Sequence, residues 1–194
     1  MPRLIARFAR ERPDMSISFQ SHYSTKIQEW VLSGLFEVGV CEMPLIYDAL
    51  DSHVFHFETL LAVPENSPLA GHEVLAPHLL DEEPFIVMGP DHMTNRRTRE
   101  AFHNAGVPLR TRVHTHLFKN VLSFVQEGMG VAILDPFSLE FDSGGGIVTR
   151  RFRPAVLMEL AVITSRARPL SALGQQLLEL LLDELRPYAV EPTR

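Results

Sequence analysis

An acidic residue stands at the end of a short apolar stretch of the chain. Residues 36–41, FEVGVC, are mostly apolar and typical of a buried strand, and Glu42 follows them directly. In an α/β protein, ligands bind outside the carboxyl ends of the parallel strands, so Glu42 is a candidate ligand contact. Its charge would select an amine or guanidinium group. The alternative is a solvated loop carboxylate.

Polar side chains at three expected helix starts or turns form a second group of candidates. They are Ser24 with Thr25, Thr94 with Asn95, and Thr115 with His116. The free N–H groups and the dipole at a helix N-terminus attract anions, and a hydroxyl can help to hold a carboxylate. Plain N-caps without a ligand are the alternative. The guanidinium group of Arg96 or Arg97 could donate paired hydrogen bonds to a carboxylate, although arginines on helices are more often exposed to solvent.

Two features that suggest metal binding or catalysis lack the partners they need. His114 and His116 have the spacing that places both imidazoles on one face of a strand, but no nearby carboxylate or cysteine completes a ligand set. Cys41 has apolar neighbours and is expected to be a buried structural thiol. The glycines at 144–146 are not followed by the Lys-Ser/Thr pair of a phosphate loop and indicate a turn. We therefore expect no metal and no cofactor.

Helices and strands that could position these residues alternate along the chain. Beyond an opening helix that ends at Pro13, helices are expected at 24–34, 94–106, 118–128 and 171–186. Strands are expected at 15–20, 36–41, 58–64, 84–89, 111–117, 130–136, 144–152 and 158–164. Ser24 or Thr25, and Thr94 or Asn95, are the expected caps of their helices. This alternation predicts an α/β protein built from βαβ units.

Composition narrows the class of protein. The 194 residues are 45% hydrophobic and 22% charged, which is typical of a globular chain. A net charge of −6 disfavours nucleic-acid binding by this chain alone. A single cysteine cannot form an internal disulfide, which fits a reducing cytoplasm. The opening residues do not resemble a signal peptide, and no stretch is long enough to span a membrane. The expectation is a soluble, cytoplasmic protein with no membrane partner.

The order of these segments resembles the effector-binding domain of LysR-type transcriptional regulators over nearly the whole chain. The more specific segments are LLAVPENSPLA at 60–70 and VQEGMGVAILDP at 125–136. GLFEVGV at 34–40 takes the place of the family's Gly-x-Leu-Asp-hydrophobic-Gly. The winged helix-turn-helix of such regulators is absent, and so is the first strand of their subdomain I. The chain starts at the helix that follows this strand in the family.

The resemblance implies an α/β fold like that of type II periplasmic binding proteins. Two Rossmann-like subdomains would be joined by strands that cross near Glu58 and Met158, with the effector in the cleft between them. Subdomain I would comprise residues 1–57 and 158–194, and subdomain II residues 58–157. In family members a residue at the position of Glu42 contacts effectors.

The resemblance further implies a non-enzymatic domain that controls transcription. A small-molecule effector would change subdomain closure in a homodimer or higher homo-oligomer, and DNA would be bound only through the absent N-terminal domain. FEVGVCEMP at 36–44 is similar to family members that sense opines and related amino-acid derivatives. Hydroxyls for a carboxylate and Glu42 for a cation suit such a zwitterion. The alternative is a small-molecule enzyme on an α/β scaffold, metal-assisted through His114 and His116.

Overall fold

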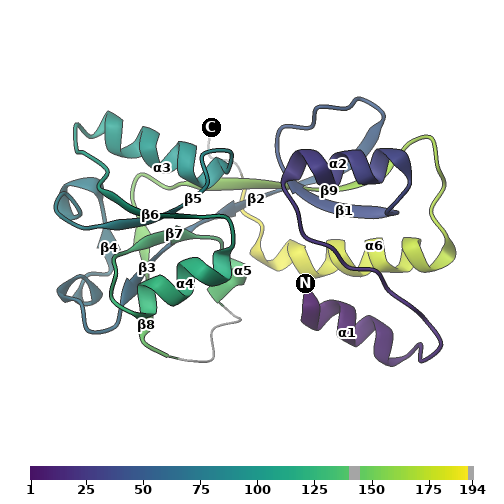
Figure 1. Ribbon diagram of the computed structural model, residues 1–194, viewed down its shortest axis with the longest axis horizontal. Helices are drawn as coiled ribbons and strands as arrows, with labels where there is room; N and C mark the ends of the chain where they lie inside the picture. The colour runs from purple at the N-terminus through teal and green to yellow at the C-terminus, as the bar shows by residue number, and fades with distance from the viewer. Residues whose placement is uncertain (140–144, 192–194) are drawn as a thin grey trace. The chain divides into compact units, whose positions relative to one another are not determined.

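The computed structural model describes residues 1–139 and 145–191, which form two compact units. Unit 1 comprises Met1–Phe55 and Leu160–Ala189, and unit 2 comprises the described residues between His56 and Glu159 together with Val190 and Glu191. Two long strands, β2 (Leu50–Glu58) and β9 (Leu157–Ser165), contribute residues to both units (Figure 1). Within the described ranges, no helix is both long and apolar enough to cross a membrane.

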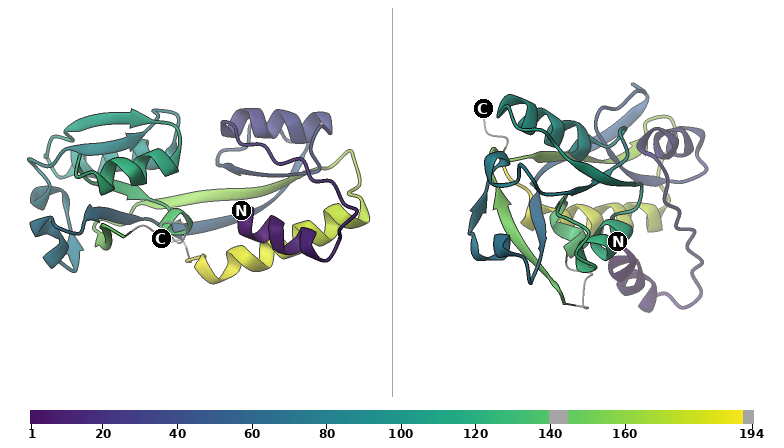
Figure 2. Two further views of the ribbon diagram at one scale, coloured as in Figure 1. Left: turned by 60° about the horizontal axis from the view of Figure 1, so that its bottom comes forward. Right: turned by 60° about the vertical axis from the view of Figure 1, so that its left-hand side comes forward.

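Unit 1 contains a three-stranded sheet in the order β1-β9-β2, and β1 (Val38–Glu42) runs antiparallel to β9. Its helices are α1 (Pro2–Arg10), α2 (Ser24–Ser33), α6 (Ala172–Leu185) and the 3₁₀ turn η3 (Arg186–Tyr188). Helices α2 and α6 lie on opposite sides of β1 and β9 (Figures 1 and 2). One core cluster of this unit is formed by Val31, Cys41, Leu50, Ala161 and Ile163.

Local sequence signals define the ends of the unit 1 helices. Helix α2 ends at Gly34, whose positive φ of 77° is the left-handed conformation that glycine adopts most readily. Helix α6 begins after Ser171, whose hydroxyl accepts a hydrogen bond from the Gly174 N–H at 3.0 Å. Glu37 in turn accepts hydrogen bonds from the Ser171 N–H and hydroxyl, at 2.6 and 3.0 Å. This contact ties the start of α6 to the residue that precedes β1.

Unit 2 is built on two sheets. One has the order β4-β8-β3-β7, and the other pairs β5 with β6 in parallel. The strands are β3 (Leu60–Pro64), β4 (Val74–Leu75), β5 (Phe85–Met88), β6 (Thr111–Thr115), β7 (Ala132–Leu134) and β8 (Ile147–Phe152). The helices are η1 (Pro68–Gly71), η2 (Pro77–Leu79), α3 (Met93–Asn104), α4 (Phe118–Gln126) and α5 (Pro136–Leu139).

The apolar run of β5 explains the two-sided core of unit 2. All four of its residues are buried, as in strands covered on both faces. Phe85 and Val87 belong to a cluster that includes Phe102 of α3. Ile86 and Met88 belong to a second cluster that includes Val125 of α4. The strand's alternation therefore assigns one helix to each face, as Figure 1 shows.

Most of the expected elements are present, but two expectations need correction. Residues 15–20 were expected to form a strand, and the structure shows none there. Their alternating pattern is real, but a strand needs a neighbouring strand to pair with, and none in the described chain pairs with this segment. Strand β2 is missing from the expected elements, because Asp51, Ser52 and His53 make its first half polar and exposed. The strand expected at 58–64 corresponds to β3 and shares only Glu58 with β2.

Candidate functional site

Two of the candidate residues of unit 1 meet at the end of β1. The Ser24 hydroxyl oxygen accepts a hydrogen bond from the Glu42 N–H at 3.0 Å. Ser24 is the first residue of α2, so this bond joins the start of the helix to the carboxyl end of the strand. Thr25 is exposed beside it. The structure therefore gathers Ser24, Thr25 and Glu42 in one place, although they are distant in sequence.

The expectation that Ser24 or Thr25 caps α2 is wrong. The N-cap is Tyr23, and no side chain makes a capping hydrogen bond there. The physical reason is that Ser24 lies inside the first turn with its hydroxyl bound to the Glu42 N–H instead. The Ser24 oxygen thus accepts a hydrogen bond from the protein, and this bond leaves the O–H donor that a carboxylate would need.

Cys41 is a structural thiol. Its side chain is buried in the unit 1 core beside Val31 and Ile163. Burial, and secondarily the charge of Glu42, raises the pKa of the Cys41 thiol to about 12. Because the thiolate is the nucleophilic form, this environment makes Cys41 unreactive near neutral pH. The interpretation of Cys41 as a buried structural thiol is confirmed.

The candidate residues of unit 2 lie in the first turn of α3. The N-cap is His92, and Thr94 and Asn95 are buried one and two residues after the helix begins at Met93. The expectation that Thr94 or Asn95 caps this helix is wrong, because both side chains face the interior. The Asn95 amide donates to the carbonyl of Met88, the last residue of β5, and its oxygen accepts from Arg99 Nε at 2.8 Å. Asn95 therefore holds the start of α3 against the carboxyl end of β5.

Unlike the side chain of Asn95, the hydroxyl group of Thr94 has no hydrogen-bond partner among the described residues. Its side chain is 2% exposed, and its hydroxyl oxygen makes no hydrogen bond within the described chain. A buried hydroxyl without a partner costs free energy, so such groups are rare in folded proteins and need an explanation. Helix α3 is 12 residues long, and Thr94 stands at the end where its dipole is positive. Among the described residues of unit 2, it is the one buried side-chain oxygen or nitrogen without a hydrogen-bond partner.

Thr115 and His116 complete the unit 2 set. Thr115 is the last residue of β6 and lies opposite Met88 in the parallel pair of strands. The carboxyl ends of β5 and β6 are therefore adjacent, which brings the buried Thr115 near the start of α3. A side chain at Gly89 would collide with the His116 ring, so that ring covers the backbone just after β5. The structure thus places Asn95, Thr115 and His116 around the adjacent carboxyl ends of β5 and β6, and Thr94 in the first turn of α3 next to Asn95. Their role as effector contacts stays a prediction.

The two histidines of the His-x-His pair do not share a strand. His114 is exposed on β6, and His116 lies beyond the end of that strand. Across residues 1–139 and 145–191, no group of three His, Cys, Asp or Glu side chains is placed to hold a metal ion. Gly144 of the expected glycine turn lies outside the described residues, while Gly145 and Gly146 have the positive φ values of a turn.

The guanidinium group of Arg97 is hydrogen-bonded to other residues of the chain. Its Nη1 donates to the Leu157 carbonyl at 2.6 Å, and its Nη2 pairs with the carboxylate of Glu159. Arg96 is exposed and donates to the Asp91 carbonyl. Arg97 and Glu159 are 62 residues apart, so no local pattern could have revealed the pair. Arg97 therefore attaches α3 to the start of β9, and both terminal nitrogens of its guanidinium group already bind the protein.

A separate cavity of about 330 Å³ lies within unit 1. It is lined mainly by apolar side chains, including Trp30, Phe36 and Leu181. None of the site residues expected from the sequence lines it. Sequence reasoning missed this cavity because its lining comes from segments that are distant along the chain.

Comparison with known proteins places this arrangement in a family. Residues 1–186 match the family model described as the LysR substrate binding domain. The chain belongs to this family. The regulatory protein NocR of Agrobacterium tumefaciens (strain T37) is 27% identical over 191 residues, covering 97% of this chain and 64% of NocR. The transcriptional activator protein LysR of Escherichia coli (strain K12) is 26% identical over 176 residues, covering 90% of this chain and 57% of LysR.

Solved LysR-family domains have the same fold. The regulatory domain of Synechocystis PCC6803 CcmR, in complex with 2-PG, has a TM-score of 0.78 at 19% identity, covering 94% of this chain and 89% of that one. The effector-binding domain of BenM, with its effector benzoate, has a TM-score of 0.77 at 15% identity, covering 99% and 89%. The predicted α/β fold of the type II periplasmic-binding-protein kind is confirmed.

Proposed function

We propose that this chain is the effector-sensing domain of a LysR-type transcriptional regulator. The observation that carries the proposal is the family match across residues 1–186. The relatives NocR and LysR are named as regulatory proteins, and the chain spans 64% and 57% of their lengths. In the proposed regulator, DNA is bound by a part outside these 194 residues. The proposed regulator acts in the cytoplasm as a homodimer or higher homo-oligomer.

We further propose that units 1 and 2 are the two subdomains implied by the resemblance, with boundaries near residues 57 and 158. The domain works by binding and not by catalysis. The described residues offer the His114 and His116 pair no third ligand, and the one thiol is buried with a raised pKa. An enzymatic role would need a nucleophile or an acid–base pair that is positioned to react. The regulatory names of the relatives support the same choice.

The proposed effector is an amino acid or amino-acid derivative. The unit 2 set of Thr94, Asn95, Thr115 and His116 suits a carboxylate, because it lies at a helix N-terminus and contains a buried hydroxyl without a partner. The unit 1 set of Ser24, Thr25 and Glu42 adds an acidic group, which suits an amine or guanidinium. A zwitterion carries both groups. One relative is named as an octopine catabolism/uptake operon regulatory protein, which supports this class.

Calorimetric titration tests the proposal. Amino acids and their conjugates, octopine among them, are titrated into the wild type, Glu42→Gln and the control Asp48→Asn. Glu42→Gln keeps the size of the side chain and removes its charge, so it should weaken binding by about 1.5–3 kcal/mol, roughly ten- to a hundredfold. Asp48→Asn removes a charge at an exposed loop position of unit 1 and should have no effect. Equal affinities for all three proteins would remove Glu42 from the site.

The identity of the ligands that bind tests the effector class separately. Binding of only uncharged or purely anionic compounds would overturn the zwitterion proposal. Sedimentation velocity tests the assembly, and a monomer at micromolar concentration would contradict the proposed oligomer.

A further inference from the structure

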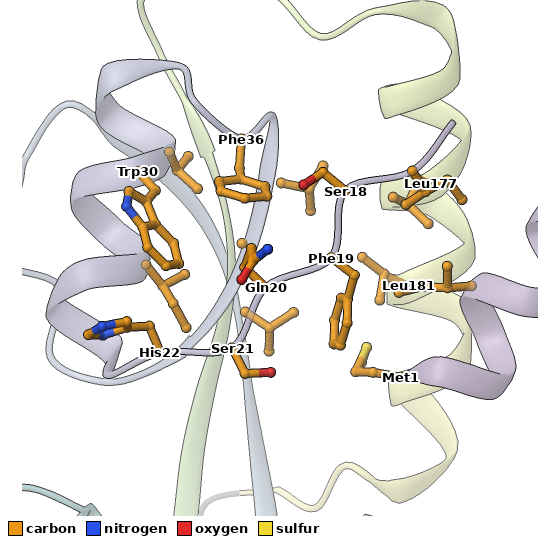
Figure 3. Close-up of a pocket in the computed structure, with 17 residues that line it drawn as sticks. Met1, Ser18, Phe19, Gln20, Ser21, His22, Trp30, Phe36, Leu177 and Leu181 are labelled. Carbon is orange, nitrogen blue, oxygen red and sulfur yellow. The ribbon is translucent and has the colours of Figure 1, made fainter. Parts of the chain in front are cut away.

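A second cavity, of about 470 Å³, lies within unit 2. The cavity of unit 1 is apolar and surrounded by Trp30, Phe36 and Leu181 (Figure 3), whereas most of the residues around this one are polar or charged. None of the candidate effector residues lines it. Its lining comes from the end of η1 with the residues that follow, and from β8, and includes Gly71, His72, Glu73, Thr149, Arg150 and Arg151.

The sheet of unit 2 is incomplete beside this cavity. Strand β8 pairs with β3 along Ile147–Arg151. On its other side β8 pairs with β4, which begins only at Val74, opposite Arg151. Thr149 lies two residues before Arg151, so it has a strand beside it on the β3 side and no residue of β4 opposite it.

The backbone N–H of Thr149 points to this incomplete side. The N–H groups of Arg151 and Arg153 donate to the carbonyls of Glu73 and Leu75, which lie at or next to β4. Odd-numbered residues at this end of the chain segment therefore direct their N–H groups away from β3, because the direction alternates from one residue to the next. Thr149 is odd-numbered, so its N–H is directed toward the cavity that it lines.

Arg150 adds a positive charge that no carboxylate of the described chain neutralises. Its Nε and Nη2 donate to the Ala70 carbonyl, at 3.0 Å for Nε, and its Nη1 donates to the Thr149 carbonyl at 2.7 Å. Both acceptors are neutral, and no acidic residue forms an ion pair with Arg150 among the described residues. A guanidinium group has five N–H donors, so two are not used by these bonds. Arg150 is thus a half-buried cation that is held in place and keeps donors for a further acceptor.

Arg151 makes the lining positive overall. It is exposed, and its side chain makes no hydrogen bond or ion pair within the described chain. Glu73 is the one acid of the lining, so two arginines and one glutamate give a formal charge of +1 with His72 neutral. The whole chain has a net charge of −6, so this local charge is opposite in sign to that of the protein.

We propose that the unit 2 cavity binds an oxyanion, the phosphate or carboxylate group of a small molecule, at a site separate from the effector site proposed above. The Thr149 N–H and the guanidinium groups of Arg150 and Arg151 donate hydrogen bonds to it. Unpaired N–H groups at a sheet edge form anion-binding concavities, and a guanidinium group matches the geometry of phosphate and carboxylate. There is room for the rest of the molecule, because a Cβ at Gly71 would meet no atom within 4 Å.

Amide chemical shifts test the site directly, with inorganic phosphate and acetate as the two probes. Each ion is titrated into the ¹⁵N-labelled protein near neutral pH, and sodium chloride keeps the ionic strength constant. The amide signal of Thr149 should move saturably, because its N–H gains an acceptor. The signal of Val148, whose N–H is directed to β3, should move less. The ion that binds more tightly identifies the group, and no saturable shift at Thr149 with either ion would overturn the proposal.

Three substitutions of exposed side chains test the charges. Arg151→Gln removes one cation of the lining and should weaken binding of the ion about tenfold or more. Glu73→Gln removes the one acid and should strengthen binding about two- to fivefold. Arg112→Gln is the matched control, because Arg112 is an exposed arginine of β6 that does not line the cavity. It should leave the affinity unchanged.

The pattern across the variants separates a built site from general attraction to basic residues. An equal loss of affinity in Arg151→Gln and Arg112→Gln would mean that the ion responds to the charge of unit 2 as a whole, and would overturn the proposal. Shifts that centre on the start of α3 instead of Thr149 would assign the ion to the effector set and would also overturn it. Far-UV circular dichroism of each variant should match that of the wild type, which shows that a change in affinity is not a loss of fold.

Discussion

Replacing Thr94 by Val should stabilise the protein in the absence of effector. The Thr94 hydroxyl oxygen is buried and has no hydrogen-bond partner in the described chain. An unsatisfied buried hydroxyl costs about 1–3 kcal/mol, and Val has nearly the same shape without the polar atom. Thr and Val are both β-branched and have similar helix propensities, so the backbone of α3 should not oppose the change. We expect the free energy of unfolding to rise by about 1 kcal/mol, the lower end of that range.

Thr98 provides the matched control one turn along the same helix. Both side chains are 2% exposed, but the Thr98 hydroxyl donates to the Thr94 carbonyl at 2.7 Å. Thr98→Val loses this bond and should lower the free energy of unfolding by about 0.5–1.5 kcal/mol. The two substitutions are chemically identical, yet their effects should have opposite signs.

Urea unfolding followed by far-UV circular dichroism measures both changes, with Trp30 fluorescence as a second probe that reports on unit 1. For a chain of this length, a change of 1 kcal/mol corresponds to a shift in Tm of about 2–4 °C. If Thr94→Val destabilises the protein as much as Thr98→Val does, the Thr94 hydroxyl has a partner and the reasoning is refuted. If the hydroxyl also serves the effector, Thr94→Val should bind the effector more weakly despite its greater stability.

Three further outcomes are expected. Cys41, with its pKa raised to about 12, should react with thiol reagents at pH 8 only after unfolding, and rapid labelling of the native protein would contradict its burial. Burial raises the pKa of Asp135 in the folded protein above its value of 3.8 in the unfolded chain. The stability that Asp135 contributes is therefore complete below pH 3.8, and it is lost as the pH rises through the pKa of the folded state. Urea midpoints between pH 4 and 7 should therefore fall more steeply for the wild type than for Asp135→Asn, and parallel curves would contradict this. Gly39→Ala would place a Cβ 2.8–3.0 Å from Ile27, Val31 and Ile163, and should destabilise by about 1–3 kcal/mol, whereas Gly71→Ala, with open space around it, should be neutral.

The sequence by itself determined the elements whose signals are local. The apolar spacing of Val121, Leu122 and Val125 predicted the buried face of α4, and Ser171 predicted the start of α6. Gly34 predicted the end of α2. The apolar run from Phe85 to Met88 predicted a buried strand. These signals suffice because helix periodicity, capping and strand burial depend on residues a few positions apart.

The tertiary structure decided which partner each polar side chain meets. The local pattern around Ser24 predicted an N-cap, but the Ser24 hydroxyl accepts a hydrogen bond from the N–H of Glu42, which is 18 residues away in the sequence. The sequence pattern of α3 predicted an exposed Arg97, but its guanidinium group donates hydrogen bonds to Glu159 and to the Leu157 carbonyl. The alternation of residues 15–20 predicted a strand, yet a strand exists only where another strand pairs with it. Such partners are set by chain folding over tens of residues, which no local pattern records.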